Sequence, residues 1–345
     1  MRISRRHWLV AGALAGALFC AAGSYAVLSE ELHFAAAPAR IEVRAAPIAS
    51  FDNRDPSKVR FGALEFRGGL VLTSSHPAFG GISAFHMEAD GSHFLAATDN
   101  GSWLRGRIVY RDGKPDGIAD VEIAPILGSN GKPVASRGWF DVESLTELGG
   151  QFYIGIERVD QILRFDIRRD GFMARGEPIA VPPDFKTLGF NKSLECLAAA
   201  PANSAIAGNL IVITEQTLDS AGNHRSFLLK GGEVGRFSVK RSDDFDVTDC
   251  TILPPGDLLI VERRYSPARG VAMRIRRVPV AAIKEGALVD GKVLIEADLA
   301  YQIDNMEGIA VHRNAAGETV ITLVSDDNFS VIQRNLLLQF VLMGE

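Results

Sequence analysis

Acidic residues recur at two equivalent places in a segment that is repeated five times along the sequence. At the end of a first short apolar run, one copy carries Ser83 and the other four carry an acid: Glu143, Glu195, Asp249 and Glu307. At the end of a second apolar run every copy carries an acid, namely Asp99, Glu157, Glu215, Glu262 and Asp326. If the copies are arranged around a common axis, these carboxylates converge on one site.

Carboxylates that crowd into one partly dry site need a positive partner. Like charges repel and raise one another's pKa values unless a cation or a basic side chain neutralises them. Calcium suits such a site because it binds about six to eight oxygens in flexible geometry, whereas no histidine pair at zinc-ligand spacing occurs. We therefore expect calcium or a similar divalent cation, with ligands drawn from Glu143, Asn191, Glu195, Asp249, Asn305 and Glu307.

This set of residues suggests metal-assisted hydrolysis of an ester or a phosphoester. In this hypothesis the cation polarises the carbonyl or phosphoryl oxygen and a carboxylate activates water, with Glu195, Glu307 and Asp326 as the catalytic residues. Lys192 and Arg263 are expected to hold an anionic small-molecule substrate. The sequence contains neither G-x-S-x-G nor H-E-x-x-H, so it does not indicate a serine esterase or a zinc protease.

A structural role for the same acids is the alternative interpretation. Acids at strand ends also cap turns, accept hydrogen bonds from backbone amides, or form ion pairs, and Lys192, Arg263 and Arg264 are close enough in sequence for such pairs. The sequence leaves the metal site and the structural network both open.

The spacing of the repeats indicates an all-β fold. Measured between Ser83 and the four acids that match it, the repeats are 60, 52, 54 and 58 residues apart, which is long enough for one four-stranded antiparallel sheet each. Turn residues such as those at 89–91 and 254–257 separate the two apolar runs, as in a β-hairpin. We therefore predict a β-propeller, with a sandwich or an irregular solenoid as the alternatives.

The two ends of the chain supply further predicted strands. Residues 59–74 and 331–342 fall outside the five repeats and are apolar enough to form strands. Strands from the two termini that join in one sheet would close the ring and pair edges that are otherwise exposed. We expect six blades, the sixth made in this way, within a propeller domain that spans residues 59–345.

The first 26 residues have the pattern of an export signal. Arg2, Arg5 and Arg6 precede an apolar stretch at 8–22 and small residues at 24–26. Residues 4–9 resemble the twin-arginine motif, and a Sec signal is the alternative. The apolar stretch is shorter than the roughly 20 residues that span a bilayer. We therefore expect a signal peptide at 1–26, a leader segment at 27–58, and a periplasmic or secreted protein with no stable membrane span after signal removal.

Charge and cysteine content limit the partners and the covalent framework. The formal net charge of −5 argues against nucleic acid as a partner. Only Cys196 and Cys250 follow the predicted signal, at matching positions of neighbouring repeats. This spacing allows a bridge, but we expect two separate buried thiols because cysteine commonly packs as a small apolar residue. No coiled-coil pattern is present, so a monomer is expected.

Several segments resemble the family called esterase-like activity of phytase. They are residues 79–83 with 98–101, 191–198, 305–310, 325–329 and 333–338. Ser193 stands where that family usually has glycine, and Cys196 where it has a small residue. The resemblance implies a propeller and an ester or phosphoester hydrolase. The sequence is also distantly similar to lactonase propellers whose acidic ring holds a divalent ion.

A non-enzymatic function remains the second hypothesis. A propeller can present a binding face for a peptide, a glycan or an envelope component without performing any reaction. Trp103 and Trp139 lie outside the acidic strand ends and could belong to such a face.

Overall fold

The computed structural model describes residues 34–189 and 192–344. The chain divides into two units, Met1–Leu32 and His33–Glu345. The predicted signal peptide at 1–26 lies outside the described residues. In the part of the chain that the structure describes, no helix is long and apolar enough to cross a membrane.

The described chain is built almost entirely of strands. Its few helical turns are η1 (Ala135–Arg137), η2 (Glu157–Val159), α2 (Ile167–Asp170), η3 (Gly171–Met173), η4 (Pro183–Thr187) and η5 (Val280–Ala282). The strands are β1 (Ala39–Arg40), β2 (Arg44–Ile48), β3 (Arg60–Phe61), β4 (Leu64–Thr73), β5 (Ile82–Met87), β6 (His93–Thr98), β7 (Ser102–Arg111), β8 (Lys114–Pro125), β9 (Leu127–Gly128), β10 (Val142–Leu148), β11 (Gln151–Ile156), β12 (Gln161–Phe165), β13 (Arg175–Pro178), β14 (Cys196–Ala199), β15 (Leu210–Leu218), β16 (His224–Lys230), β17 (Glu233–Val239), β18 (Asp246–Leu253), β19 (Asp257–Ser266), β20 (Gly270–Val278), β21 (Leu288–Val289), β22 (Lys292–Asp298), β23 (Asn305–Arg313), β24 (Thr319–Asp326) and β25 (Asn335–Leu342).

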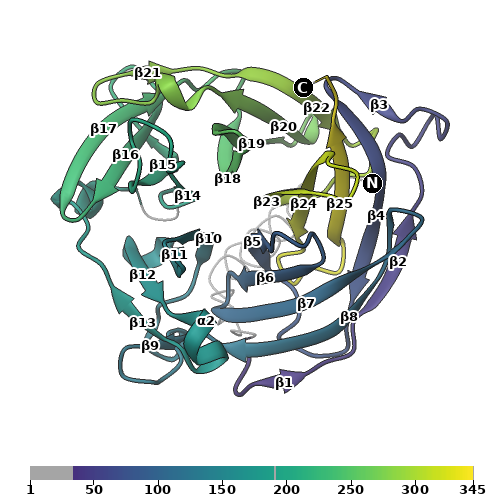
Figure 1. The fold of residues 1–345 in the computed structure, drawn as a ribbon, viewed down its shortest axis with the longest axis horizontal. Coiled ribbons are helices and arrows are strands. Elements are labelled where there is room, and N and C mark those ends of the chain that lie inside the picture. The colour runs from purple at the N-terminus through teal and green to yellow at the C-terminus, as the bar shows by residue number, and fades with distance from the viewer. Residues whose placement is uncertain (1–33, 190–191, 345) are drawn as a thin grey trace, which may run out of the picture. The chain divides into compact units, whose positions relative to one another are not determined.

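These strands form five sheets around a common centre, as Figure 1 shows. The innermost strands are β5, β10, β14, β18 and β23, one from each sheet, and each contacts the innermost strand of the next sheet, with β23 returning to β5. The described residues therefore form a β-propeller of five blades, which confirms the predicted fold class.

The fifth blade explains why no sixth blade is present in the described chain. β4, from the N-terminal side, pairs with β25, and β25 pairs with β24 and through it with β23. The strands from both termini therefore complete the fifth repeat instead of building a separate sheet, so the expected number of six blades is corrected to five. The fifth repeat needs them because only β23 and β24 belong to its own hairpin.

Part of the expected leader segment also joins the sheets. β1 extends the first blade by pairing with β8, with Ala39 opposite Ile123. β2 extends the fifth blade by pairing with β4, with Ala45 opposite Leu72. Residues 39–48 thus cover edges that the outer strands of these two blades would otherwise expose to solvent.

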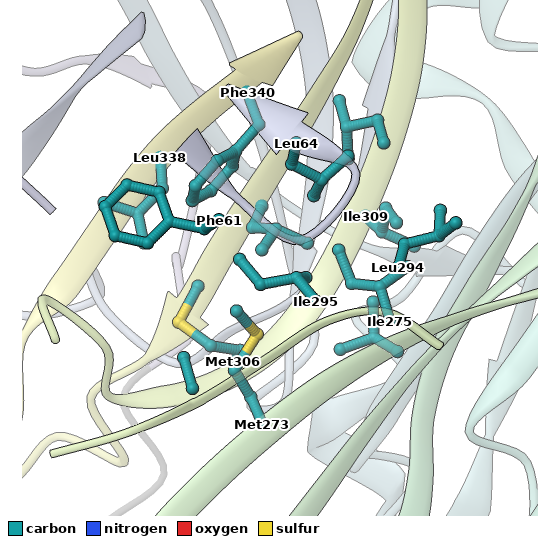
Figure 2. Packing of buried hydrophobic residues seen from close by; sticks show 14 of the residues in the cluster. Phe61, Leu64, Met273, Ile275, Leu294, Ile295, Met306, Ile309, Leu338 and Phe340 are labelled. Atoms are coloured by element: carbon teal, nitrogen blue, oxygen red, sulfur yellow. The ribbon is translucent and has the colours of Figure 1, made fainter. Parts of the chain in front are cut away.

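A large apolar cluster joins the fourth and fifth blades (Figure 2). Met273 and Ile275 of β20 pack with Met306 and Ile309 of β23 in this cluster, which also includes Phe340 of β25. All of them are buried. Burial of a side chain of this size stabilises the fold by about 1.5–3 kcal/mol, so packing between blades compensates for the absence of a central core in a ring of sheets.

Polar side chains link the innermost strands of neighbouring blades. The Ser83 hydroxyl donates to the carbonyl of Val142 at 2.6 Å, and the Ser144 hydroxyl donates to the carbonyl of Leu194 at 2.8 Å. The Thr248 hydroxyl donates to a carbonyl on β23 at 2.9 Å. These bonds fix the relative heights of the inner strands, and hence of the residues at their ends.

A disulfide joins Cys196 of β14 to Cys250 of β18, with the two Cα atoms 5.1 Å apart. The expectation of two separate thiols is therefore wrong. The two cysteines occupy neighbouring inner strands that contact each other, so their side chains meet across the boundary between blades. The bond closes a loop between residues 54 positions apart, and loops of this size typically gain about 2–4 kcal/mol from a disulfide.

Candidate functional site

A β-bulge places a side chain at the start of the innermost strand in four of the five blades. The register of these strands skips Ser83, Glu143, Thr248 and Glu307. In the third blade, Glu195 comes directly before β14 at the corresponding place. A bulge re-aims the extra residue and bends the strand, so these five side chains occupy equivalent positions around the ring.

The pairing of the fourth blade corrects the alignment of the repeats. Asp246 lies opposite Arg263, just as Asn305 lies opposite Asp326 in the fifth blade. The equivalents in the fourth blade are therefore Thr248 and Arg263, one residue away from the expected Asp249 and Glu262. A shift of one residue in a strand sends every side chain to the opposite face, so this small error changes which groups share the site.

Arg263 consequently lies among carboxylates, at a place where the other four blades carry an acid. Its Nη1 donates to Oε1 of Glu307 at 2.7 Å and to Oδ1 of Asn305, and its Nη2 donates to Oε1 of Glu215 at 3.4 Å. Burial alone would lower the pKa of Arg263, but Glu307, Glu215 and Glu195 outweigh that effect and raise it. Arg263 therefore remains a cation and neutralises part of the surrounding negative charge.

We call the surrounding acids the acidic cluster: Asp99, Asp141, Glu143, Glu157, Glu195, Glu215, Glu307 and Asp326. They come from the strand ends of the first, second, third and fifth blades. Negative charge on other members of the group helps to raise the pKa values of Asp99, Glu143, Glu157, Glu195, Glu215, Glu307 and Asp326. Asp141 helps to raise the pKa of Asp99 and of Glu143.

Three members of the acidic cluster are close enough to share a cation. Glu157, Glu195 and Glu215 each present a carboxylate oxygen, and these three oxygens lie within 4.8 Å of one another. All three side chains are buried. Glu157 also accepts a hydrogen bond from the backbone amide of Ser193, which fixes it beside the third blade. A group of carboxylate oxygens at this separation fits a hard divalent cation such as calcium.

Burial raises the pKa values of the acids that lie around Asp141 in the acidic cluster. It raises the pKa of Asp99 and of Glu157 to about 8 and the pKa of Glu215 to about 7. Burial, reinforced by neighbouring carboxylates, raises the pKa values of Glu195 and Asp326 well above their ordinary range. Without a bound cation these groups hold protons near neutral pH, because protonation removes the repulsion between buried like charges.

The protein without divalent cations should therefore lose stability as the pH rises from 6.5 to 8.5. In the unfolded chain these carboxyls have pKa values of about 4 and are ionised throughout this pH range, whereas Asp99, Glu157 and Glu215 still bind protons in the folded state. The folded state then holds more protons, so the free energy of unfolding falls with pH, by up to about 1.4 kcal/mol per pH unit for each such group.

Urea unfolding in the presence of a chelator, repeated across this pH range, measures the slope. The buried His224 and His312 have lowered pKa values, so they make the free energy of unfolding rise with pH until the histidines of the unfolded chain have lost their protons, at about pH 6.5. The measured range therefore begins at pH 6.5. A free energy of unfolding that rises with pH in this range would contradict the protonation described for the acidic cluster.

The structure brings most of the predicted site residues together. Glu143, Glu195, Glu307 and Asp326 belong to the acidic cluster. Arg263 and Asn305 are both hydrogen-bonded to Glu307. The Lys192 side chain is exposed, and Asn191 lies outside the described residues. Asp141, Glu157 and Glu215 were not among the expected ligands or catalytic residues, although the repeat pattern had placed Glu157 and Glu215 at strand ends.

Asp249 lies apart from the acidic cluster. Its Oδ2 accepts a hydrogen bond from the backbone amide of Ile309 at 2.7 Å. Its Oδ1 is buried and has no partner among the described residues, and burial raises the pKa of this carboxyl well above its ordinary range. Asp249 thus joins the inner strands of the fourth and fifth blades.

Glu262 is also separate from the acidic cluster and is completely buried. Arg274 donates to both of its carboxylate oxygens, with Nε at 2.6 Å and Nη2 at 3.2 Å. Arg276 does the same at 2.7 and 2.6 Å. Both carboxylate oxygens of Glu262 accept hydrogen bonds from both guanidinium groups. Glu262 therefore stabilises the sheet of the fourth blade and is not available to a ligand.

Five cavities formed by the described residues are lined by residues outside the acidic cluster. A cavity of about 220 Å³ lies among the innermost strands, where Met87, Thr146 and Thr251 belong to its lining. Larger cavities, of about 470 and 590 Å³, are lined by other residues, including Tyr110 for the first and Tyr153 for the second. The chemical groups, rather than the size of a cavity, therefore identify the candidate site.

Comparisons with solved structures give distant matches. No curated protein sequence matches the chain. Among solved structures, the PQQ-bound aldose sugar dehydrogenase of Streptomyces coelicolor is 12% identical, with a TM-score of 0.41, and the match covers 88% of this chain and 100% of that one. The glutaminyl cyclase of Myxococcus xanthus is 10% identical, with a TM-score of 0.40, and the match covers 77% and 92%.

The family comparison extends over most of the propeller. Residues 77–329 match the phytase-like model, which is described as esterase-like activity of phytase. The matched range includes all eight members of the acidic cluster and Arg263. The chain therefore belongs to the phytase-like family.

Proposed function

We propose that this protein is an exported hydrolase that cleaves a small-molecule ester or phosphoester with the help of a divalent cation, most suitably calcium. The observation that carries the proposal is the convergence of Glu157, Glu195 and Glu215, whose carboxylate oxygens lie within 4.8 Å of one another. Membership of the phytase-like family supports a hydrolytic reaction.

The three glutamates, of which the sequence suggested only Glu195 as a ligand, fit a cation better than Asn305, Glu307 and Asp249 do. Asn305 and Glu307 are hydrogen-bonded to each other and to Arg263, and Asp249 is bonded to the backbone of the fifth blade. Glu157, Glu195 and Glu215 would therefore hold the ion. When bound, it supplies positive charge that polarises a carbonyl or phosphoryl oxygen.

The remaining side chains would bind the substrate and move protons. Arg263 is held in place by Glu307 and Asn305, so it can present a fixed donor to an oxygen of the substrate. Asp326 has a pKa raised well above its ordinary range by burial and by Glu307. In its protonated form this carboxyl would donate a proton to the leaving group, and once a bound cation has lowered its pKa it would accept one from the attacking water.

Export is part of the proposal. The disulfide between Cys196 and Cys250 supports it, because structural disulfides form and persist mainly in oxidising compartments. The arginine-rich start of the sequence, with its apolar stretch, has the composition of an export signal.

Calcium is expected to stabilise the protein and to remain bound after purification. A ligand that binds only the folded state at about 100 times its Kd adds about 2.7 kcal/mol to the free energy of unfolding. Elemental analysis measures the calcium that remains bound, and melting curves in calcium, in magnesium and in chelator measure the gain in stability.

Turnover of an ester panel in the same buffers completes the test of the proposal. A stoichiometric ion with chelator-sensitive turnover would support it. A bound ion with no turnover of any ester would favour a binding propeller instead, and a chelator that changed neither the melt nor the turnover would refute the metal site.

A further inference from the structure

The hairpin turns of the first and fifth blades form a cavity that contains no residue of the acidic cluster. Its volume is about 470 Å³, which is usual for a small-molecule site. The turns at 90–91, 112–114 and 314–318 contribute to its lining, together with the buried side chains of His312 and Gln339. β6 and β24 lead from two of these turns to Asp99 and Asp326, so the cavity and the acidic cluster lie at opposite ends of the strands.

His312 of β23 is a buried polar side chain in this lining. It is only 7% exposed, and its Nδ1 has no hydrogen-bond partner among the described residues. The other edge of the ring lies against the turn between β5 and β6, where a Cβ atom at Gly91 would come within 2.5 Å of Nε2. Burial lowers the pKa of His312 against the opposing effect of Asp90, so the ring is neutral at pH 7. A buried polar atom without a partner is costly, and a polar ligand would supply that partner.

A β-bulge places Arg67 in the same lining. The register of β25 with β4 skips this residue, and a bulge re-aims the side chain of the residue that it leaves unpaired. Its Nη2 donates to Oε1 of Glu318 at 2.6 Å, whereas its Nε is buried and has no partner among the described residues. An arginine N–H group can only donate, so the Nε of Arg67 needs an oxygen acceptor.

The charges of the lining are nearly balanced. The charged residues are Arg67, Asp90, Asp112, Lys114 and Glu318. Arg67 pairs with Glu318. Asp90 accepts hydrogen bonds from two backbone amides of its own turn and is hydrogen-bonded to the ring of His93 at 2.6 Å. The other two charges are opposite and belong to one turn, so the cavity favours a ligand without net charge, because a charged one would lose its hydration without gaining an unpaired counter-charge.

Tyr110 gives the lining a half-buried aromatic ring. Its hydroxyl donates to the carbonyl of Gly91 at 2.7 Å and accepts a hydrogen bond from Nε2 of Gln339 at 2.8 Å. These two bonds fix the ring and occupy its hydroxyl, so the ring is available mainly as an apolar surface. The cavity thus combines an apolar surface with a few placed polar groups, as small-molecule sites do.

We propose that this cavity binds a neutral sugar ring, either a monosaccharide or the end of a glycan. A sugar hydroxyl both donates and accepts hydrogen bonds, so one can accept from Nε of Arg67 and another can pair with the neutral ring of His312. The C–H face of the sugar can pack on the ring of Tyr110. This binding site goes beyond the proposed hydrolase and does not depend on it, because the cavity shares no residue with the acidic cluster.

Isothermal titration and ligand-observed NMR test the proposal on the purified protein. The probes are glucose, galactose, mannose and N-acetylglucosamine. Glucuronate and glucosamine carry a negative and a positive charge on a similar ring, and serine is a small zwitterion. We expect at least one neutral sugar to bind saturably, with glucose or N-acetylglucosamine at least about tenfold tighter than its charged analogue. A chelator should leave this binding unchanged.

A tryptophan in the turn between β23 and β24 should block the cavity. Ala316 is exposed and lines the cavity, so Ala316→Trp should lower sugar affinity at least about tenfold without disturbing the core. Ala221→Trp is the matched control. Both alanines are exposed, and the amide of each donates to the side chain two residues earlier, Asn314 at 3.0 Å and Asp219 at 2.8 Å. The turn that carries Ala221 lies outside the cavity.

His312→Leu tests the polar contact. Leucine fills a similar buried space without a polar atom that needs a partner, so this variant should lose sugar affinity by at least about tenfold while its melting temperature does not fall. Ala316→Trp, at an exposed turn, keeps the test decisive if His312→Leu does not fold.

Each outcome decides the proposal. Saturable binding of a neutral sugar that is lost in Ala316→Trp and kept in Ala221→Trp would support it. Tighter binding of glucuronate, glucosamine or serine would overturn the assignment of a neutral sugar. Sugar binding that is unchanged in Ala316→Trp would place the sugar elsewhere and refute the site, and so would the absence of binding by all four neutral sugars. None of these results bears on the hydrolase, whose test is turnover of esters.

Discussion

Replacing Glu195 by glutamine is expected to abolish the calcium-dependent rise in stability and to lower ester hydrolysis by at least about 100-fold. Glu195 is the member of the cation-binding group that comes directly before the innermost strand of the third blade. Glutamine keeps the shape of the side chain but removes the negative charge that attracts the ion. The change should therefore affect ion binding and catalysis much more than folding.

The same substitution should not destabilise the protein in chelator. Burial and the neighbouring Glu215, Glu143 and Glu157 raise the pKa of the Glu195 carboxyl well above its usual range, so without an ion this group is held in its neutral form. A neutral amide at the same place costs no more than the protonated acid. Glu195→Gln is thus expected to abolish the calcium effect while leaving the stability in chelator unchanged.

Melting curves and isothermal titration with calcium measure these quantities, together with the rate of ester cleavage. Glu233→Gln is the control, because Glu233 is an exposed glutamate of β17 in the same blade. It should leave calcium binding and turnover as in the unchanged protein. A Glu195→Gln variant that still gains stability from calcium would contradict the assignment of the three glutamates.

The repeat pattern was sufficient to predict the class of fold. Glycine-rich and proline-rich turns between apolar runs indicated hairpins, and five copies of the same unit indicated blades. The number of blades could not be predicted from the sequence, because the pattern shows which segments form strands but not which strand each one pairs with. β4 and β25 could equally have paired alone, and it is their pairing with β24 that places them in the fifth blade.

The equivalent strand-end positions could be predicted from the repeats in the first, second, third and fifth blades, but not in the fourth blade. Asp249 and Glu262 match the acids of the other repeats by eye, yet a bulge at Thr248 changes the register by one residue. Sequence alone does not reveal which residue a bulge leaves unpaired. The change of register alters the chemistry of the site. Arg263 lies in the site as a cation, whereas Glu262 lies outside it and is hydrogen-bonded to Arg274 in a buried network.

The cysteines show a related limit. Their matching positions in neighbouring repeats placed Cys196 and Cys250 at similar heights, which made a bridge possible but did not establish it. The decisive information is the direction in which each side chain leaves its strand, and this depends on the twist and register of two separate sheets. The structure brings the two Cα atoms to 5.1 Å.

Removal of the Glu262 carboxylate should destabilise the protein by about 3–5 kcal/mol, because loss of one partner leaves buried charges uncompensated. Arg274 and Arg276 are each only 2% exposed in their side chains, and both bond to Glu262. Glu262→Ala leaves two guanidinium groups with fewer acceptors inside the sheet. Asp290 and Asp243 also pair with these arginines, so the loss should lie toward the lower end of the range.

Urea unfolding measures the effect, with Glu296→Gln as the matched control. Glu296 is an exposed glutamate on β22, the strand that pairs with β20, and it lies opposite Arg274. Its replacement should change the free energy of unfolding by less than about 0.5 kcal/mol, as is usual for surface positions. A loss below about 1 kcal/mol in Glu262→Ala would mean that water or the remaining acids already compensate the two arginines.

A combined variant separates the cost of unpaired charge from the loss of packing. Replacing Glu262, Arg274 and Arg276 together by apolar residues of similar volume removes every charge of the triad, and such replacements are often neutral or stabilising. The triple variant should therefore recover most of the stability that Glu262→Ala loses. Because Glu262 lies outside the acidic cluster, the calcium-dependent rise in melting temperature should persist in both variants, which would show that the fourth blade uses adjacent residues for different purposes: Glu262 for the sheet and Arg263 for the site.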